Sequence, residues 1–236
     1  MCELFVVRAA EPFALGEAWG LAEQMERYGL AGYGWGAAWT TPRGELAVHR
    51  EARAFRDDPA RDALAATETS SLLVHLRRPS KLSTLSLPDT QPFLDPAGRF
   101  AVGHNGDFRD FRPWRDRYRA AGRIHGRADS EVGARWLEDH WQDGSPGRAL
   151  VALHRTLGGQ ANLGLVTVEG TVALYAGNTE NPAFSFRLGR LGILATGLYS
   201  IDRSLFRLAA PGARARRVLR PGMAIAITPY GAAAAA

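Results

Sequence analysis

The feature that most constrains this chain is its single cysteine, Cys2, in 236 residues. One cysteine forms neither an internal disulfide nor a cysteine-based zinc site. The fold must therefore be held by a buried hydrophobic core, which a chain of this length builds as one domain or at most two small ones. No linker rich in Pro, Gly and Ser divides the chain, so we expect a single domain over residues 1–236.

The composition is that of an ordinary globular protein, with 46% hydrophobic and 22% charged residues. No apolar run approaches the roughly 20 residues of a membrane helix, and Glu3 stands where a signal peptide carries bases. We therefore expect a cytoplasmic protein. The net charge of +5 would attract nucleic acid, but the 24 acidic residues are interspersed, so nucleic acid is not the favoured partner.

Hydrophobic periodicity predicts strands near both ends of the chain and helices between them. The expected strands are 2–8, 32–39 paired with 45–49 as a hairpin, 71–76, 100–104, 161–168, 171–176, 184–188, 191–196 and 214–228; the expected helices are 14–28, 58–68, 129–142 and 147–157. Residues 79–99 contain four prolines and are expected to form a long ordered loop, a kind of segment that often carries function. This order predicts a layered α+β domain, and the alanine tail over 232–236 has no assigned role.

Position alone leaves two interpretations of Cys2. If Met1 is removed, Cys2 becomes a nucleophile that carries its own base, because an α-amine titrates near neutrality, at about 7.7–8.0, and accepts the thiol proton. Otherwise Cys2 is a small hydrophobic residue at the start of a buried strand.

Three other places hold residues suited to catalysis, each with a plainer interpretation. Asn105-Gly106 follows an apolar strand, where an amide and backbone N–H groups suit an oxyanion, but Asn-Gly is also a common hairpin turn. Arg77 suits bidentate binding of a carboxylate, or is one surface arginine among 28. Asp129 suits a substrate ammonium, or caps the helix that follows.

Six short motifs occur in a fixed order over about residues 2–135, and together they are more specific than any one of them. They are Met1-Cys2-Glu3-Leu4, Gly34-Trp35-Gly36, His75-Leu76-Arg77, Thr90-Gln91-Pro92-Phe93, Gly103-His104-Asn105-Gly106 and Asp129-Ser130-Glu131. This order resembles the class II glutamine amidotransferases, a branch of the N-terminal-nucleophile hydrolases. More narrowly, the chain is similar to their stand-alone amidohydrolase-like members, such as the γ-glutamyl amidohydrolase of ergothioneine biosynthesis.

The resemblance implies a four-layer αββα sandwich with Cys2 at a sheet end. It assigns Cys2 as the nucleophile, with the Asn105 amide and the Gly106 N–H as the oxyanion hole. It places Arg77 on the α-carboxylate and Asp129 on the α-ammonium of a glutamyl substrate, with His104 in the same substrate-binding set. A γ-glutamyl thioester would form on Cys2 and then be hydrolysed.

Four positions depart from the family pattern: Tyr33, Arg78, Gln91 and Gly197. Tyr33 stands where an acid is more usual, Arg78 where a tryptophan is frequent in members with a synthase domain, Gln91 replaces a common histidine, and Gly197 stands where an acid is frequent. The first three are expected near the substrate, so they bear on the leaving group rather than on the core chemistry.

The segment 108–127 places seven arginines among four aromatic residues. Such a segment is either a nucleic-acid surface, with bases stacked on aromatics, or an amphipathic segment whose aromatics face the core. The second interpretation is favoured.

The sequence therefore predicts a glutaminase-like amidohydrolase that needs no cofactor and no metal, since the six histidines lack metal-ligand spacing. Free hydrolysis is expected because no synthase domain follows in this sequence. Two alternatives stay open: a glutaminase subunit that feeds ammonia to a separate synthase, and a non-catalytic module that holds an acidic partner or nucleic acid through 108–127. A homo-oligomer is also left open.

Overall fold

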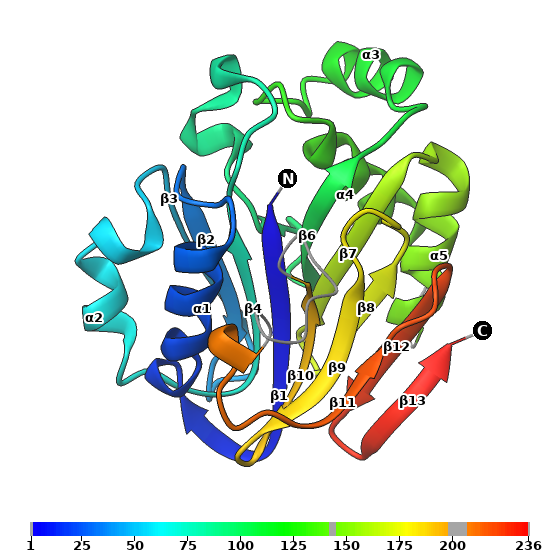
Figure 1. The fold of residues 1–236 in the computed structure, drawn as a ribbon. Coiled ribbons are helices and arrows are strands. Elements are labelled where there is room, and N and C mark those ends of the chain that lie inside the picture. The colour runs from blue at the N-terminus through cyan, green and yellow to red at the C-terminus, as the bar shows by residue number, and fades with distance from the viewer. Residues whose placement is uncertain (1, 142–144, 198–206, 236) are drawn as a thin grey trace.

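Two antiparallel sheets face each other in the computed structural model, which describes residues 2–141, 145–197 and 207–235 (Figure 1). The first sheet has the order β11-β9-β10-β1-β4-β2-β3, and the second has the order β13-β12-β8-β7-β6-β5. Helices α1 and α2 cover the outer face of the first sheet, and α4 and α5 cover that of the second (Figure 1). The chain thus forms the four-layer αββα sandwich that the resemblance implies.

The first sheet contains seven strands: β1 (Glu3–Ala14), β2 (Trp35–Thr40), β3 (Leu46–Glu51), β4 (Glu68–Leu76), β9 (Ala183–Leu188), β10 (Leu191–Thr196) and β11 (Arg214–Val218). The second contains β5 (Phe93–Leu94), β6 (Phe100–Asp107), β7 (Gln160–Thr167), β8 (Val172–Ala176), β12 (Met223–Thr228) and β13 (Gly231–Ala235). The α-helices are α1 (Gly16–Tyr28), α2 (Ala60–Leu64), α3 (Arg112–Ala120), α4 (Asp129–His140) and α5 (Pro146–Leu157); short 3-10 turns are η1 (Phe55–Asp57), η2 (Leu82–Thr84) and η3 (Leu87–Asp89).

Strand β1 shows how alternation divides the core into layers. Successive side chains of a strand point to opposite faces. Leu4 and Val6 lie in the cluster between the two sheets, whereas Phe5 and Val7 lie in the cluster under α1. All four are fully buried, which explains why this segment is apolar without interruption.

Two segments of the chain differ from the sequence-based expectation. Asn105-Gly106 is not a turn, because β6 stays paired with β7 through Asp107 opposite Gln160. The expected strand 214–228 is two strands in different sheets, since the chain turns at Gly222, where φ is +82°.

The second helix and the alanine tail also differ from expectation. The helix expected over 58–68 is only α2, because β4 already begins at Glu68. The tail joins the second sheet as β13, paired with β12.

The N-terminal end of β1 lies at one end of the sandwich, between the segments that contain η2, η3 and α3 (Figure 1). Strand β1 pairs with β10 on one side and β4 on the other, so its position is fixed by two ladders. No helix among the described residues is long and apolar enough to cross a membrane.

Candidate active site

Cys2 directly precedes β1, and its thiol lies against the backbone of Arg78. Its Sγ accepts a hydrogen bond from the Arg78 N–H at 3.3 Å and lies 3.4 Å from the Arg78 carbonyl oxygen. Burial raises the pKa of the Cys2 thiol to about 11, against the opposing effect of the Arg78 N–H. The thiol is therefore protonated near neutral pH and needs a base to become a nucleophile.

Asn105 is the residue of β6 that meets Cys2. Its side-chain Nδ2 donates to the Cys2 carbonyl oxygen, and the residue is fully buried. Its Oδ1 accepts from Asn162 Nδ2 at 2.9 Å and from Asn181 Nδ2 at 3.3 Å. Two donors on Oδ1 fix which way the amide faces, because the flipped amide would oppose donors to donors. Within the described residues the second N–H of this amide has no partner, so it is available to a ligand.

All four asparagines of the chain meet at this place, and we call them the asparagine cluster: Asn105, Asn162, Asn178 and Asn181. Asn162 Oδ1 accepts the N–H groups of Gly177 and Asn178, and its Nδ2 also donates to the Asn181 carbonyl at 2.7 Å. All four residues are buried. The cluster thus connects β6, β7 and the loop after β8, and it holds the side-chain amide of Asn105 in place.

Gly106 follows Asn105 with a φ of +131°. A Cβ atom at this position would collide with the carbonyl oxygen of Gln160 on β7. Only glycine allows the paired strand to continue in this conformation. The glycine of the Asn-Gly motif is therefore required by the backbone of a paired strand and not by a turn.

Arg77 is buried, in contrast to the surface interpretation, with 3% of its area exposed. Its guanidinium donates to the carbonyl oxygens of Thr84 and Ser86 and to Thr90 Oγ1. Burial lowers its pKa, and Asp89 and Cys2 act in the opposite direction. A buried guanidinium held only by neutral groups is well suited to receive a carboxylate.

Asp129 is the first residue of α4 and does not cap it. Ala128 is the N-cap, and no side chain makes a capping bond there. Instead Asp129 Oδ2 accepts the Phe108 N–H at 2.6 Å, which ties α4 to the end of β6.

Asp89 is a buried residue that the sequence did not single out. Its Oδ1 accepts the N–H groups of Arg127 and Ala128, at 2.5 and 2.6 Å, and its Oδ2 accepts from Ser86 Oγ at 2.9 Å. It therefore links the loop that holds Arg77 to the residues just before Asp129. Neither spacing nor composition marks this aspartate, because two of its partners are backbone N–H groups 38 and 39 residues away.

His104 lies on the opposite face of β6 from Asn105, as strand alternation requires. Its ring stacks on Phe108 at 4.2 Å, and its Nδ1 lies 2.9 Å from Ser130 Oγ. Burial lowers the pKa of His104, which favours the neutral ring. The side-chain amide of Gln91 hydrogen-bonds to the backbone N–H and carbonyl of His104 and also donates to Ser130 Oγ. The structure therefore places His104 and Gln91 in a buried network behind the site, not beside Cys2.

In the segment 108–127 the aromatic residues face the core. Phe108 and Tyr118 are buried, Phe111 and Trp114 pack against the same cluster, and most of the arginines are exposed. This confirms the amphipathic interpretation of the segment. In the part of the chain that the structure describes, no group of three His, Cys, Asp or Glu side chains is placed to hold a metal ion.

Comparison with known proteins gives matches in structure alone. No family model matches the chain, and no curated protein matches its sequence. Its fold is similar to that of the glutamine phosphoribosylpyrophosphate amidotransferase of Bacillus subtilis (TM-score 0.76, 16% identity), with 99% of this chain and 49% of that one covered.

Two other solved structures share the fold. One is described as the allosteric regulatory enzyme of purine biosynthesis (TM-score 0.77, 15% identity, 99% of this chain and 48% of that one). The other is a glutamine aminotransferase class-II domain protein from Silicibacter pomeroyi (TM-score 0.65, 18% identity, 99% and 98%). The chain spans about half the length of the first two structures and nearly all of the third.

Proposed function

From the fold that the chain shares with glutamine amidotransferases of class II, we propose that it hydrolyses the γ-glutamyl amide bond of glutamine or of a γ-glutamyl compound, with Cys2 as nucleophile. The observation that carries the proposal is the Asn105 amide, which is oriented by the asparagine cluster and lies beside the backbone of Cys2 with one N–H unpaired among the described residues.

The first step needs Met1 to be removed, so that Cys2 has a free α-amine. This amine accepts the thiol proton, and the thiolate attacks the γ-carbonyl carbon. The developing oxyanion takes a hydrogen bond from the Asn105 amide and a second from the Gly106 N–H. The C–N bond then breaks, the leaving amine takes the proton, and a γ-glutamyl thioester remains. Water attacks the thioester, and glutamate and the free thiol are released.

The two ends of the glutamyl group are assigned to Arg77 and Asp129. A carboxylate that approaches Arg77 takes over hydrogen bonds now made to the carbonyl oxygens of Thr84 and Ser86. Asp129 has one carboxylate oxygen on the Phe108 N–H, and its other oxygen is assigned to the substrate ammonium. One charge of each sign then selects a zwitterionic substrate.

The experiment is a glutamate-release assay with glutamine and several γ-glutamyl amides, after intact-mass measurement shows that Met1 is absent. We expect turnover by the processed protein and none by Cys2→Ala, with both giving the same circular dichroism. Protein that retains Met1 is the matched control, since it has the thiol but no free amine. Lack of turnover by protein shown to lack Met1 contradicts the enzymatic proposal and leaves the binding-module alternative.

A further inference from the structure

A cavity lies away from Cys2, beside the middle of β1, where Arg8, Ala9 and Ala10 line it. It has a volume of about 860 Å³ and opens between the edges of the two sheets, among β9, β10, β11 and β12. Arg8 lines it and is six residues along β1 from Cys2, which corresponds to about 20 Å of strand. The volume falls within the range of small-molecule sites, roughly 300–1,000 Å³. This cavity is therefore separate from the proposed active site.

One wall of this cavity carries arginines on the face of the first sheet that packs against the second sheet. Val6 and Leu194 are paired across β1 and β10 and lie in the core between the sheets. Paired residues of neighbouring strands share a face, and so do residues two apart on one strand. The register therefore places Arg8, then Gly192, then Arg187 in one row that faces the second sheet.

The register extends this basic wall onto β11. Arg214 is paired with Arg187, and Arg217 is paired with Ser185, the residue two positions before Arg187. Like charges placed directly opposite each other in a sheet are destabilising. We call Arg8, Arg187 and Arg217, which all line the cavity, the arginine wall.

The arginine wall has no carboxylate partner within the described residues. Arg8 donates through Nη1 to two carbonyl oxygens, of Ala9 and Ser70, and its buried Nε has no partner there. Burial lowers the pKa of Arg8, so its surroundings disfavour the charge that it carries. An anion in the cavity would relieve both this cost and the repulsion between Arg187 and Arg214.

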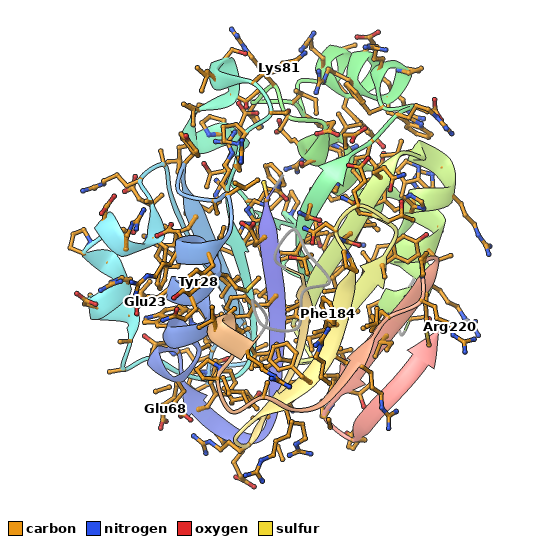
Figure 2. The ribbon with its side chains drawn as sticks, in the orientation of Figure 1. Glu23, Tyr28, Glu68, Lys81, Phe184 and Arg220 are labelled. Atoms are coloured by element: carbon orange, nitrogen blue, oxygen red, sulfur yellow. The ribbon has the colours of Figure 1, made fainter. Side chains whose placement is uncertain are left out.

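The facing wall is apolar. Met223, Ile225 and Ile227 of β12 line the cavity from the second sheet, and Leu194 lines its floor. Gly192 lies in the middle of the arginine row, where a Cβ atom would lie 3.3 Å from the Arg8 carbonyl oxygen and 3.5 Å from Ile227 Cδ1. A larger side chain at this position would therefore fill the space between the arginine row and β12. Figure 2 shows Arg220, which also lines the cavity, at the edge of the molecule beside β12.

We propose that this cavity binds a small amphipathic anion, whose oxyanion headgroup lies on the arginine wall and whose apolar body packs on β12. Guanidinium groups bind carboxylate and phosphate alike through paired N–H donors. The shared chemistry is therefore an oxyanion on an aliphatic chain, and either an aliphatic carboxylate or an alkyl phosphate supplies it.

The test measures displacement of the fluorescent anion 8-anilinonaphthalene-1-sulfonate from the purified protein. We expect saturable binding of one probe per chain, with displacement by decanoate or decyl phosphate at least about tenfold more effective than by decanol, which lacks the charge. Acetate and inorganic phosphate lack the apolar body and should displace poorly. The ratio of decanoate to decyl phosphate identifies the preferred headgroup. Absence of saturable binding, or equal displacement by decanol, overturns the proposal.

Variants locate the binding to this cavity. The double variant Arg187→Gln/Arg217→Gln should weaken decanoate or decyl phosphate binding about tenfold or more, and Gly192→Leu should block the space. Arg43→Gln/Arg119→Gln removes the same charge from exposed positions outside the cavity and should bind as wild type does. Cys2→Ala should also bind normally, which separates this result from the fate of the proposed activity. Equal loss in both double variants contradicts the assignment, provided that thermal unfolding shows both to be folded.

Discussion

At the residue scale, the chemistry proposed for this chain depends on which way one amide faces. Asn105 presents its N–H groups to Cys2 because Asn162 and Asn181 donate to its oxygen. If the amide were flipped, its oxygen would face the developing oxyanion, and the repulsion would raise the barrier. Asn162 and Asn181 are therefore positioning residues rather than catalytic ones.

Asn162→Ala tests this role. The variant loses the donor to Asn105 Oδ1 and leaves buried groups unpaired, so we expect kcat to fall about tenfold to a hundredfold while KM changes little, with a loss of about 1–3 kcal/mol in stability. Steady-state kinetics of glutamate release measure the split between kcat and KM. Gln160→Ala is the matched control, since that amide on the same strand binds Thr179. A wild-type kcat in Asn162→Ala would show that the cluster does not orient Asn105.

The buried carboxyl group of Glu3 predicts how the stability of the fold depends on pH. Burial raises its pKa from 4.5 to about 7, against the Leu30 N–H, which acts in the opposite direction. The folded state then holds a proton that the unfolded state releases, so stability from this group is present below about pH 4.5 and is lost as pH rises through about 7. This loss corresponds to about 3 kcal/mol.

Glu3→Gln should therefore raise the free energy of unfolding near pH 8 by up to about 3 kcal/mol and change it much less at or below about pH 4.5. Urea unfolding at the two pH values measures the difference. Glu26→Gln is the control, because that buried carboxylate has Arg56 at 3.6 Å and the Phe55 N–H as partners, so its replacement should not stabilise. Equal effects of Glu3→Gln at both pH values would contradict the raised pKa.

Individual residues could be predicted from the sequence where the motif itself contains the chemistry. Cys2, Asn105 and Arg77 are brought to one end of the sandwich as expected, and whether they act as assigned stays a prediction. Asn162 and Asp89 could not be predicted, because their partners come from strands and loops far away in sequence. His104 stands in the same motif as Asn105, but strand alternation points its ring to the other face.

At the element scale, a buried aspartate connects the loop over 79–99 to the residues that precede α4. Asp89 joins the η3 turn to the residues that lead into α4, and Arg77 holds the same loop through its carbonyl oxygens. The two proposed substrate-binding residues are thus connected through one buried carboxylate.

Asp89→Ala should loosen both segments, because two backbone N–H groups lose their acceptor. We expect faster amide exchange over 84–90 and 125–128, measured by hydrogen–deuterium exchange, and a higher KM for the γ-glutamyl substrate. Asp89→Asn should keep exchange close to wild type, since an amide oxygen accepts from Arg127 and Ala128 and its NH₂ donates to Ser86. Unchanged exchange in Asp89→Ala would show that the loop is held by other contacts.

Elements were predictable where periodicity and end signals agree, as for α1, α4 and α5. The end of β6 was not, because Asn-Gly is typical of a hairpin turn, whereas here Gly106 continues a paired strand with a positive φ. The division of 214–228 into two strands depends on which sheet each half joins, and local sequence does not contain that information.

At the scale of the whole molecule, the core between the sheets joins residues from distant parts of the chain. Leu4, Leu73, Val166, Leu194 and Leu219 share that cluster. Neither sheet keeps this face buried without the other, so we expect both to unfold together.

The six tryptophans allow this expectation to be tested. Trp19, Trp35 and Trp39 lie in the cluster outside the first sheet, and Trp114, Trp136 and Trp141 lie in or against the one outside the second. Variants that keep only one set, with the others changed to Phe, should unfold at the same urea concentration by fluorescence and by circular dichroism. Two separate midpoints would show that the layers unfold independently.

The asparagine cluster also has a consequence for how long the site stays chemically intact. In an Asn-Gly sequence the glycine nitrogen readily attacks the side-chain carbonyl, and the succinimide that forms opens to aspartate or isoaspartate. At Asn105 that ageing reaction would place a negative charge where the proposed mechanism needs a donor. Two features restrain the geometry of this attack: the pairing of β6 with β7, and the two amide N–H groups that donate to Asn105 Oδ1. The rigidity of this end of β6 therefore also slows the deamidation of Asn105.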